Sequence, residues 1–234
     1  MKTQSKTSDN EWGTLEAEPE VLQVDWRKAA VIVIDMQNCF VSKGGMLDLS
    51  GADIRPHAKV VKLIAEINRG ARIRGVKVVY VAHIYSPDFR DSGGPDSPNP
   101  RKEHALRLWE THPEWRDRLL VRGTWGSQIV DKLKPQEGDI FVEKRRYNAF
   151  FGTDLDIILR TYAIKFLVFV GVATNICVET SVREAFHLDY FPILISDATI
   201  ATGPPGIQEA TIHNIKTAFG WVTTSANVLK ALKT

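Results

Sequence analysis

Three residues of types that enzymes use for acyl transfer are spread along the chain: Asp35, Lys144 and Cys177. Each follows an apolar run of the kind that forms a buried strand. A thiol, a carboxylate that takes its proton and a cation that favours the thiolate form a coherent device for attack on a carbonyl carbon. We therefore expect hydrolysis through a covalent intermediate if the fold brings the three residues into one cleft.

Cys177 follows an apolar run that ends at Gly171, and a helical pattern begins near Asn175. A position in the first helical turn favours a thiolate, because free N–H groups and the positive end of the helix dipole lie nearby. A lone cysteine is more often a small buried hydrophobe, so position alone leaves both interpretations open. The second cysteine, Cys39, lies in the loop after Asp35 without a helix start, and we interpret it as a packing residue.

The other two residues also have simpler interpretations. An aspartate at a strand end often caps a turn, and a lysine after a strand is usually a solvated charge. All three residues at strand ends are much harder to explain by coincidence than any one alone. The combination therefore favours a shared site.

Strand and helix patterns alternate along the chain, which predicts a doubly wound α/β fold with a parallel sheet covered by helices on both faces. In such sheets ligands bind outside the carboxyl ends of the strands, where Asp35, Lys144 and Cys177 are expected. The predicted strands are residues 29–35, 77–82, 139–143, 166–171, 191–196 and 221–224. The predicted helices are residues 54–74, 154–162, 175–188, 207–219 and 225–233.

Two further segments have a distinct composition. Residues 1–22 are polar and are expected to form a flexible N-terminal arm before a single domain over residues 23–234. Residues 83–124 are irregular and rich in proline and glycine, yet they include tryptophans. A long loop in a compact domain is either disordered or functional. We therefore expect an ordered wall or lid over a pocket.

The composition argues against several classes of function. The net charge is +2 with both signs interspersed, so we expect no nucleic-acid or membrane-surface partner. We find no apolar run long enough to span a bilayer and no signal-peptide core at the N-terminus. Two cysteines do not make a disulfide framework, so we expect a reducing, cytoplasmic setting.

Several strings in the sequence resemble a known family. They are Asp35-x-Gln37-x-x-Phe40, Lys144 at a strand end and Gly171-Val-Ala-Thr-Asn-Ile-Cys-Val178. Together they resemble the isochorismatase-like cysteine hydrolases over residues 26–232. That resemblance implies a three-layer α/β/α fold with a six-stranded parallel sheet, and amide cleavage through an acyl-enzyme by an Asp35–Lys144–Cys177 triad. It also implies a cis peptide at Val172–Ala173 and an oxyanion hole formed by the N–H groups of Ala173 and Cys177.

Within the family the chain resembles the ureidoacrylate amidohydrolases of pyrimidine degradation. The matching pieces include Gly93-Gly-Pro-x-Ser-Pro-Asn99 and Asn214-Ile-x-x-x-Phe-Gly-Trp-Val222. This resemblance implies a ureido or carbamoyl substrate with a small acidic tail, a role in nitrogen metabolism and a homo-oligomer. Candidate substrate contacts are Gln37, Phe40, His83, Tyr85, Arg146 and Tyr147.

The chain also departs from those relatives, which leaves the exact substrate open. They carry an amide side chain in place of His83, a tryptophan in place of Tyr85 and hydroxyl-bearing aromatics in place of Phe40 and Met46. The metal-binding Asp-x-His string of nicotinamidase relatives is missing at residues 82–85, so we predict no metal and no other cofactor.

Alternative functions come from the same family and from other classes. Biuret, a carbamoyl amino acid or a xenobiotic urea are alternative substrates, and a catalytically silent scaffold is an alternative role. A phosphatase of the strand–Asp type needs a second aspartate where this chain has Gln37. A nucleotide-binding module needs a glycine-rich phosphate loop, which the sequence lacks.

Overall fold

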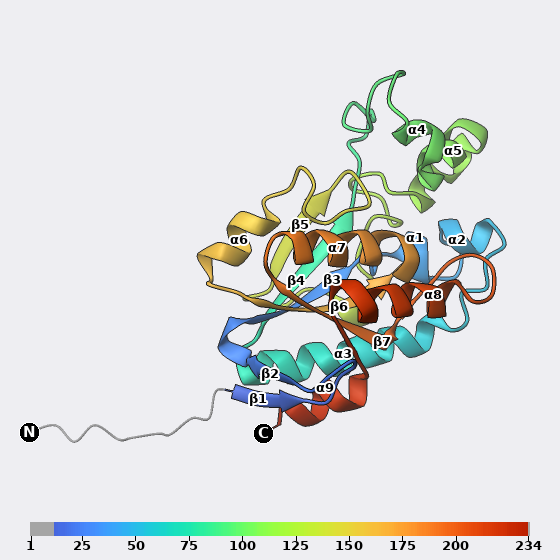
Figure 1. Cartoon of the computed structure of the whole chain (residues 1–234). Helices are drawn as coiled ribbons and strands as arrows, with labels where there is room; N and C mark the ends of the chain where they lie inside the picture. The colour runs from blue at the N-terminus through green and yellow to red at the C-terminus, as the bar shows by residue number, and fades with distance from the viewer. Residues whose placement is uncertain (1–11, 234) are drawn as a thin grey trace, which may run out of the picture.

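A six-stranded parallel sheet forms the centre of the computed structural model, which describes residues 12–233 (Figure 1). The strand order is β5-β4-β3-β6-β7-β8, with every neighbouring pair parallel. The strands are β3 (Ala29–Ile34), β4 (Lys77–His83), β5 (Ile140–Lys144), β6 (Phe166–Val172), β7 (Phe191–Ile200) and β8 (Trp221–Thr223). The predicted fold class is confirmed.

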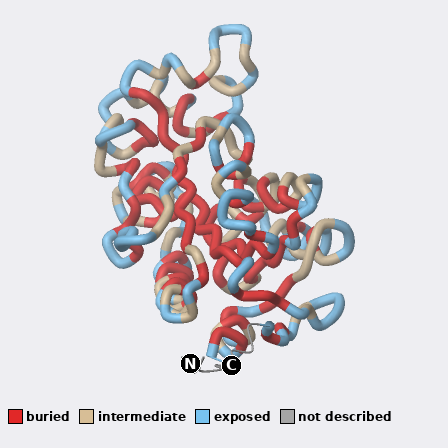
Figure 2. Tube along the Cα trace, turned by 90° about the vertical axis from the view of Figure 1, so that its left-hand side faces the viewer, coloured by how far each residue is buried: buried red, intermediate tan, exposed pale blue. Residues whose placement is uncertain are grey.

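Helices cover both faces of the sheet because the central strands are apolar on both sides. In β3, Val31 and Val33 pack on one face, whereas Ala30 and Ile32 pack on the other. The first face is covered by α3 (His57–Arg74) and α9 (Ser225–Ala231), and the second by α6 (Leu155–Thr161), α7 (Glu179–His187) and α8 (Ile207–Asn214). Figure 2 shows the buried residues concentrated along the central strands between these layers.

Residues 12–22 differ from the predicted flexible arm. They include β1 (Trp12–Leu15), which pairs antiparallel with β2 (Leu22–Asp25). The N–H of Glu18 donates to the carbonyl of Val222 at 2.8 Å, and Leu15 is fully buried. The prediction was wrong for these residues because their polar composition hid pairing with a segment about two hundred positions away. Residues 1–11 of the predicted arm lie outside the described residues.

The irregular stretch after β4 contains short helices, α4 (Asn99–Lys102) and α5 (His104–Thr111), followed by a 3₁₀ turn, Pro113–Arg118. Leu106 and Leu120 join a separate apolar cluster with Met46, which belongs to α2 (Met46–Leu49). The predicted order of this stretch is therefore confirmed. Among the described residues, none of the helices has both the length and the apolar character needed to cross a bilayer.

Candidate active site

The structure brings Asp35, Lys144 and Cys177 together at the carboxyl edge of the sheet. Asp35 follows β3, Lys144 ends β5, and Cys177 lies in a π-helical turn, Thr174–Val178, directly after β6. The Nζ atom of Lys144 lies 2.8 Å from Oδ2 of Asp35 and 3.5 Å from Sγ of Cys177. All three residues are buried. Parallel strand ends thus place the thiol, ammonium and carboxylate in one contact group.

Burial controls the protonation of this group. Burial raises the pKa of the Cys177 thiol well above its ordinary value, and the nearby Lys144 ammonium opposes that rise only in part. Burial also raises the pKa of Asp35 against the opposing charge of Lys144. The pKa of Lys144 is raised as well, because the charges of Asp35 and Cys177 outweigh its own burial. At neutral pH the lysine is therefore charged and the thiol protonated.

Activation of Cys177 by a helix start stays a prediction, and burial acts against it by raising the pKa of the thiol. The structure does correct the expectation for Cys39, which lies within the helical turn α1 (Asn38–Val41) and not in plain loop. A helix start is thus common to both cysteines.

Backbone geometry at two strand ends fixes these positions. Asp35 has a positive φ of 51°, a conformation that short polar residues adopt more readily than others. Gly171, at a φ of 115°, faces the neighbouring strand β3 so closely that a Cβ atom would overlap the carbonyl oxygen of Ile34. Glycine at 171 is therefore required for β6 to approach the chain just before Asp35.

The turn that carries Cys177 has an unusual hydrogen-bond pattern. The carbonyl of Ala173 accepts from the N–H groups of Ile176 and Val178, at 3.1 and 3.2 Å, and these two donors flank Cys177 in the chain. The peptide bond between Val172 and Ala173 is cis, as the family resemblance implies. Asn175 in the same turn exchanges two hydrogen bonds of 3.0 Å with the backbone of Thr202. This clamp holds the segment after β7 beside the cysteine.

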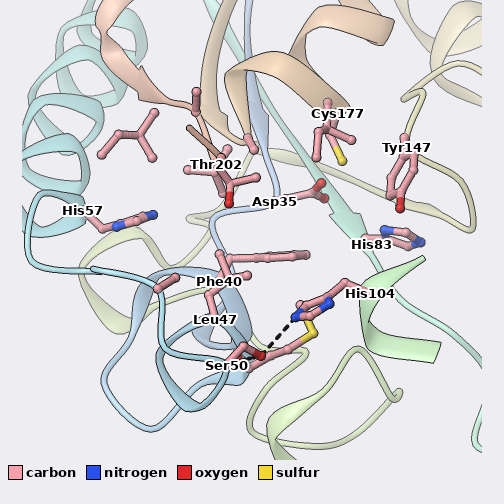
Figure 3. A pocket seen from close by; sticks show the side chains of 18 of the residues that line it. Asp35, Phe40, Leu47, Ser50, His57, His83, His104, Tyr147, Cys177 and Thr202 are labelled. Atoms are coloured by element: carbon pink, nitrogen blue, oxygen red, sulfur yellow. Dashed lines mark hydrogen bonds between the residues drawn. The ribbon is translucent and has the colours of Figure 1, made fainter. Parts of the chain in front are cut away.

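A cavity of about 610 Å³ opens onto the group. Figure 3 shows Asp35 and Cys177 close together at this cavity, with His83 and Tyr147 beside them and Phe40 and His57 farther along it. Ser50 and His104 close another part of the wall, where their side chains lie 3.0 Å apart. The lining residue His104 belongs to α5, so the irregular stretch forms part of the wall as predicted.

Three of the six predicted substrate contacts line the cavity: Phe40, His83 and Tyr147. Burial lowers the pKa of His83 well below its ordinary value, so its imidazole is neutral. Neither ring nitrogen of His83 meets hydrogen-bond geometry with a described group, although the backbone of Arg145 lies close enough to oppose the fall in pKa. A buried imidazole with so few partners is available to a ligand.

The other three predicted contacts do not line the cavity, and their polar groups have other partners. The Gln37 amide bonds with the backbone N–H and carbonyl of His83, at 2.8 and 2.9 Å. The Tyr85 hydroxyl donates to the carbonyl of Arg145, and the Arg146 guanidinium donates to the carbonyl of Asp91. In the structure Gln37, Tyr85 and Arg146 each support the surrounding backbone, and their role as direct substrate contacts stays a prediction.

Sequence reasoning missed several residues that line the cavity, including His57, Glu103, His104 and Thr202. None belongs to a string that suggested a site. Glu103 is the single residue between α4 and α5. It is buried, and that burial raises its pKa to about 7. A buried acid was not visible in the sequence, because its burial depends on packing between distant segments.

Asp35, His83 and Cys177 also have the donor types of a metal site. Their ligand atoms lie within 4.8 Å of one another. However, the ammonium of Lys144 already contacts the carboxylate and the thiol, at 2.8 and 3.5 Å. A cation there would be repelled by Lys144, so the residues present do not favour a resident metal.

Comparisons with known proteins agree with this geometry. The family described as the isochorismatase domain matches residues 29–227. The ureidoacrylate amidohydrolase RutB of Agrobacterium fabrum is 46% identical over 211 residues, which cover 90% of this chain and 92% of that protein.

Solved structures show the same likeness. A cysteine hydrolase from Pseudomonas syringae pv. phaseolicola has a TM-score of 0.76 and 30% identity, covering 90% of this chain and 94% of its own. The N-carbamoylsarcosine amidase of Thermoplasma acidophilum has a TM-score of 0.63 and 27% identity, covering 85% and 96%.

Proposed function

Because the chain belongs to the isochorismatase family, we propose that it is a cysteine amidohydrolase that cleaves a ureido or carbamoyl C–N bond, with ureidoacrylate as the leading substrate. The observation that carries the proposal is the contact of Lys144 with both Asp35 and Cys177 beside the cavity. The relatives support this substrate class, because one is named for ureidoacrylate and another for N-carbamoylsarcosine.

In the first half of the proposed reaction, Asp35 takes the proton of the Cys177 thiol and the sulfur attacks the carbonyl carbon. Lys144 stabilises the thiolate by its charge. The N–H groups of Ala173 and Cys177 form the proposed oxyanion hole for the tetrahedral intermediate. When that intermediate collapses, the C–N bond breaks, the nitrogen receives the proton from Asp35, and ammonia leaves an S-carbamoyl enzyme.

In the second half, water attacks the S-carbamoyl carbon and gives its proton to Asp35. The C–S bond breaks, the sulfur regains its proton, and a carbamic acid leaves and decomposes to an amine and carbon dioxide. Asp35 thus acts alternately as base and acid, which suits a carboxyl group whose pKa is raised by burial. Each half-reaction balances with water as the only co-reactant.

The experiment that tests the function is ammonia release from a panel of amides. Ureidoacrylate, biuret, a carbamoyl amino acid, a phenylurea and nicotinamide are each incubated with wild type and with Cys177→Ser. Release from a ureido compound that disappears in the variant supports the proposal. Release only from biuret or a phenylurea would move the substrate to the alternatives, and no release from any compound would favour a catalytically silent scaffold.

We further propose a cytoplasmic homo-oligomer that acts in pyrimidine degradation. Both cysteines are free and buried, as suits a reducing compartment. Large apolar side chains such as Trp12, Phe141 and Phe151 are exposed on the described surface, which is consistent with contacts between copies. Molar mass measured by light scattering tests the assembly, and a mass of one chain at micromolar concentration would contradict it.

A further inference from the structure

Glu103 is a buried acid beside the proposed reaction centre. Its side chain lines the same cavity as Cys177, although only 2% of the residue is exposed. Oε2 accepts the N–H of Leu106 at 2.9 Å and so caps α5. A capping role alone explains an acid at this position but not its place on the cavity wall.

The charges around the cavity make Glu103 distinctive. The carboxylates that line the cavity are Asp35, Asp53 and Glu103, and no lysine or arginine side chain is among the described lining residues. Asp35 pairs with Lys144 and Asp53 pairs with Arg55, both at 2.8 Å. Within the described residues, Glu103 has no such ion pair. An ionised carboxylate in that setting needs N–H donors, and a bound ligand is one source of them.

A ureido group supplies such donors. It has one carbonyl oxygen, for which the proposed oxyanion hole provides N–H groups, and up to three N–H donors that need acceptors inside the cavity. We propose that Glu103 is a specificity-determining residue whose carboxylate accepts substrate N–H groups, so that the site selects carbamoyl compounds whose nitrogens carry hydrogen. This inference rests on the proposed function, since it names what that site recognises.

The proposal makes recognition dependent on pH. Burial raises the pKa of Glu103 to about 7, and Asp35 adds to this effect whereas Lys144 and the N–H groups of Leu106 and Ala105 oppose it. The charge of Glu103 also acts on Cys39, Tyr85 and Tyr147, which face it from other segments. Glu103 loses its proton between pH 6 and 8, so binding of N–H donors strengthens with rising pH over that range.

Glu103→Gln tests the proposal with little change in shape. The glutamine carbonyl oxygen keeps the cap on Leu106, which leaves an NH₂ group that repels the N–H donors of the substrate. We expect kcat/KM for ureidoacrylate to fall about tenfold or more. For an analogue methylated on the internal nitrogen, the same substitution should lower kcat/KM much less, because one N–H donor is already absent from the substrate. The matched control is Glu110→Gln, an exposed position on the same helix α5.

The pH profile separates recognition from capping. Wild-type kcat/KM should rise several-fold more between pH 6 and 8 than that of Glu103→Gln, since the variant lacks the ionisation of Glu103. If Glu103→Gln matches Glu110→Gln in rate, selectivity and pH profile, Glu103 only caps the helix and the proposal is overturned.

Calorimetric binding keeps this test separate from the test of function. Ureidoacrylate and its methylated analogue are titrated into Cys177→Ser with and without Glu103→Gln. A preference for the N–H ligand that depends on Glu103 supports the inference even if wild type shows no turnover. Absence of that preference overturns it, even if wild type hydrolyses ureido compounds.

Discussion

The surroundings of Cys177 and Cys39 differ in only a few respects, and those respects separate a candidate nucleophile from a packing residue. Both cysteines are buried, both lie in a helical turn after a strand, and burial raises the pKa of both thiols. Both also belong to apolar clusters, but Cys177 has the Lys144 ammonium at 3.5 Å and lines the cavity, whereas Cys39 is not among the described lining residues. Charge and access, and not burial or a helix start, therefore distinguish the two sites.

The largest expected effect comes from replacing each cysteine by serine. Cys177→Ser should lower ammonia release by about 10³-fold or more, because the attacking sulfur is lost. Cys39→Ser should keep at least half of the activity, because its thiol does not line the cavity. Initial rates at saturating substrate, with circular dichroism to confirm folding, provide the measurement. Retained turnover in Cys177→Ser would remove the basis of the comparison.

Removing the Lys144 ammonium leaves Cys177 without a nearby cation among the described residues, as Cys39 is. Lys144→Met leaves the buried Asp35 carboxylate without its partner, which costs about 3–5 kcal/mol of folding free energy when the charge persists. The loss is smaller if Asp35 binds a proton instead, but then its role as base is lost and activity should fall about 10²-fold. Urea unfolding and ammonia release measure the two effects. The exposed Lys62→Met is the control, and equal behaviour of the two variants would contradict the role of Lys144.

The meeting of these groups was predictable from the sequence, whereas the shape of the cavity was not. Asp35, Lys144 and Cys177 each follow an apolar run, and parallel strands place their carboxyl ends at one edge. Glu103 lies in an irregular stretch, and its burial depends on packing of α5 against the segment around Met46. The pairing of Glu18 with Val222 is equally non-local. Local patterns therefore predicted the strand ends but not the segments that pack over them.

Glu103 acts on Cys39, because its negative charge helps to raise the pKa of that thiol. Its own pKa is about 7, against an ordinary value of 4.5. Between these two values the unfolded chain has lost the proton while the folded chain keeps it, so stability falls as pH rises through this window. The whole shift corresponds to about 3 kcal/mol.

Glu103→Gln removes this pH-dependent penalty. The variant should gain stability relative to wild type by about 2–3 kcal/mol between pH 5 and 8. Urea unfolding at both pH values measures the difference, and Glu110→Gln provides the reference for an exposed glutamate on α5. A constant difference between wild type and Glu103→Gln at the two pH values would show that Glu103 titrates normally.

The smallest expected effect is a difference in alkylation rate, which compares the two cysteines in one molecule. Because burial raises both pKa values, neither thiol is largely ionised at pH 7, and access decides the order of reaction. Iodoacetamide should therefore label Cys177 about tenfold faster than Cys39, and a ligand that fills the cavity should protect Cys177 alone. Both rates should rise with pH from 7 to 9, because the thiolate fractions rise. Peptide mass spectrometry after timed quenching resolves the two sites. Equal rates would show that access to the cavity does not distinguish these thiols. A Cys177 rate that is already constant at pH 7 would contradict its raised pKa.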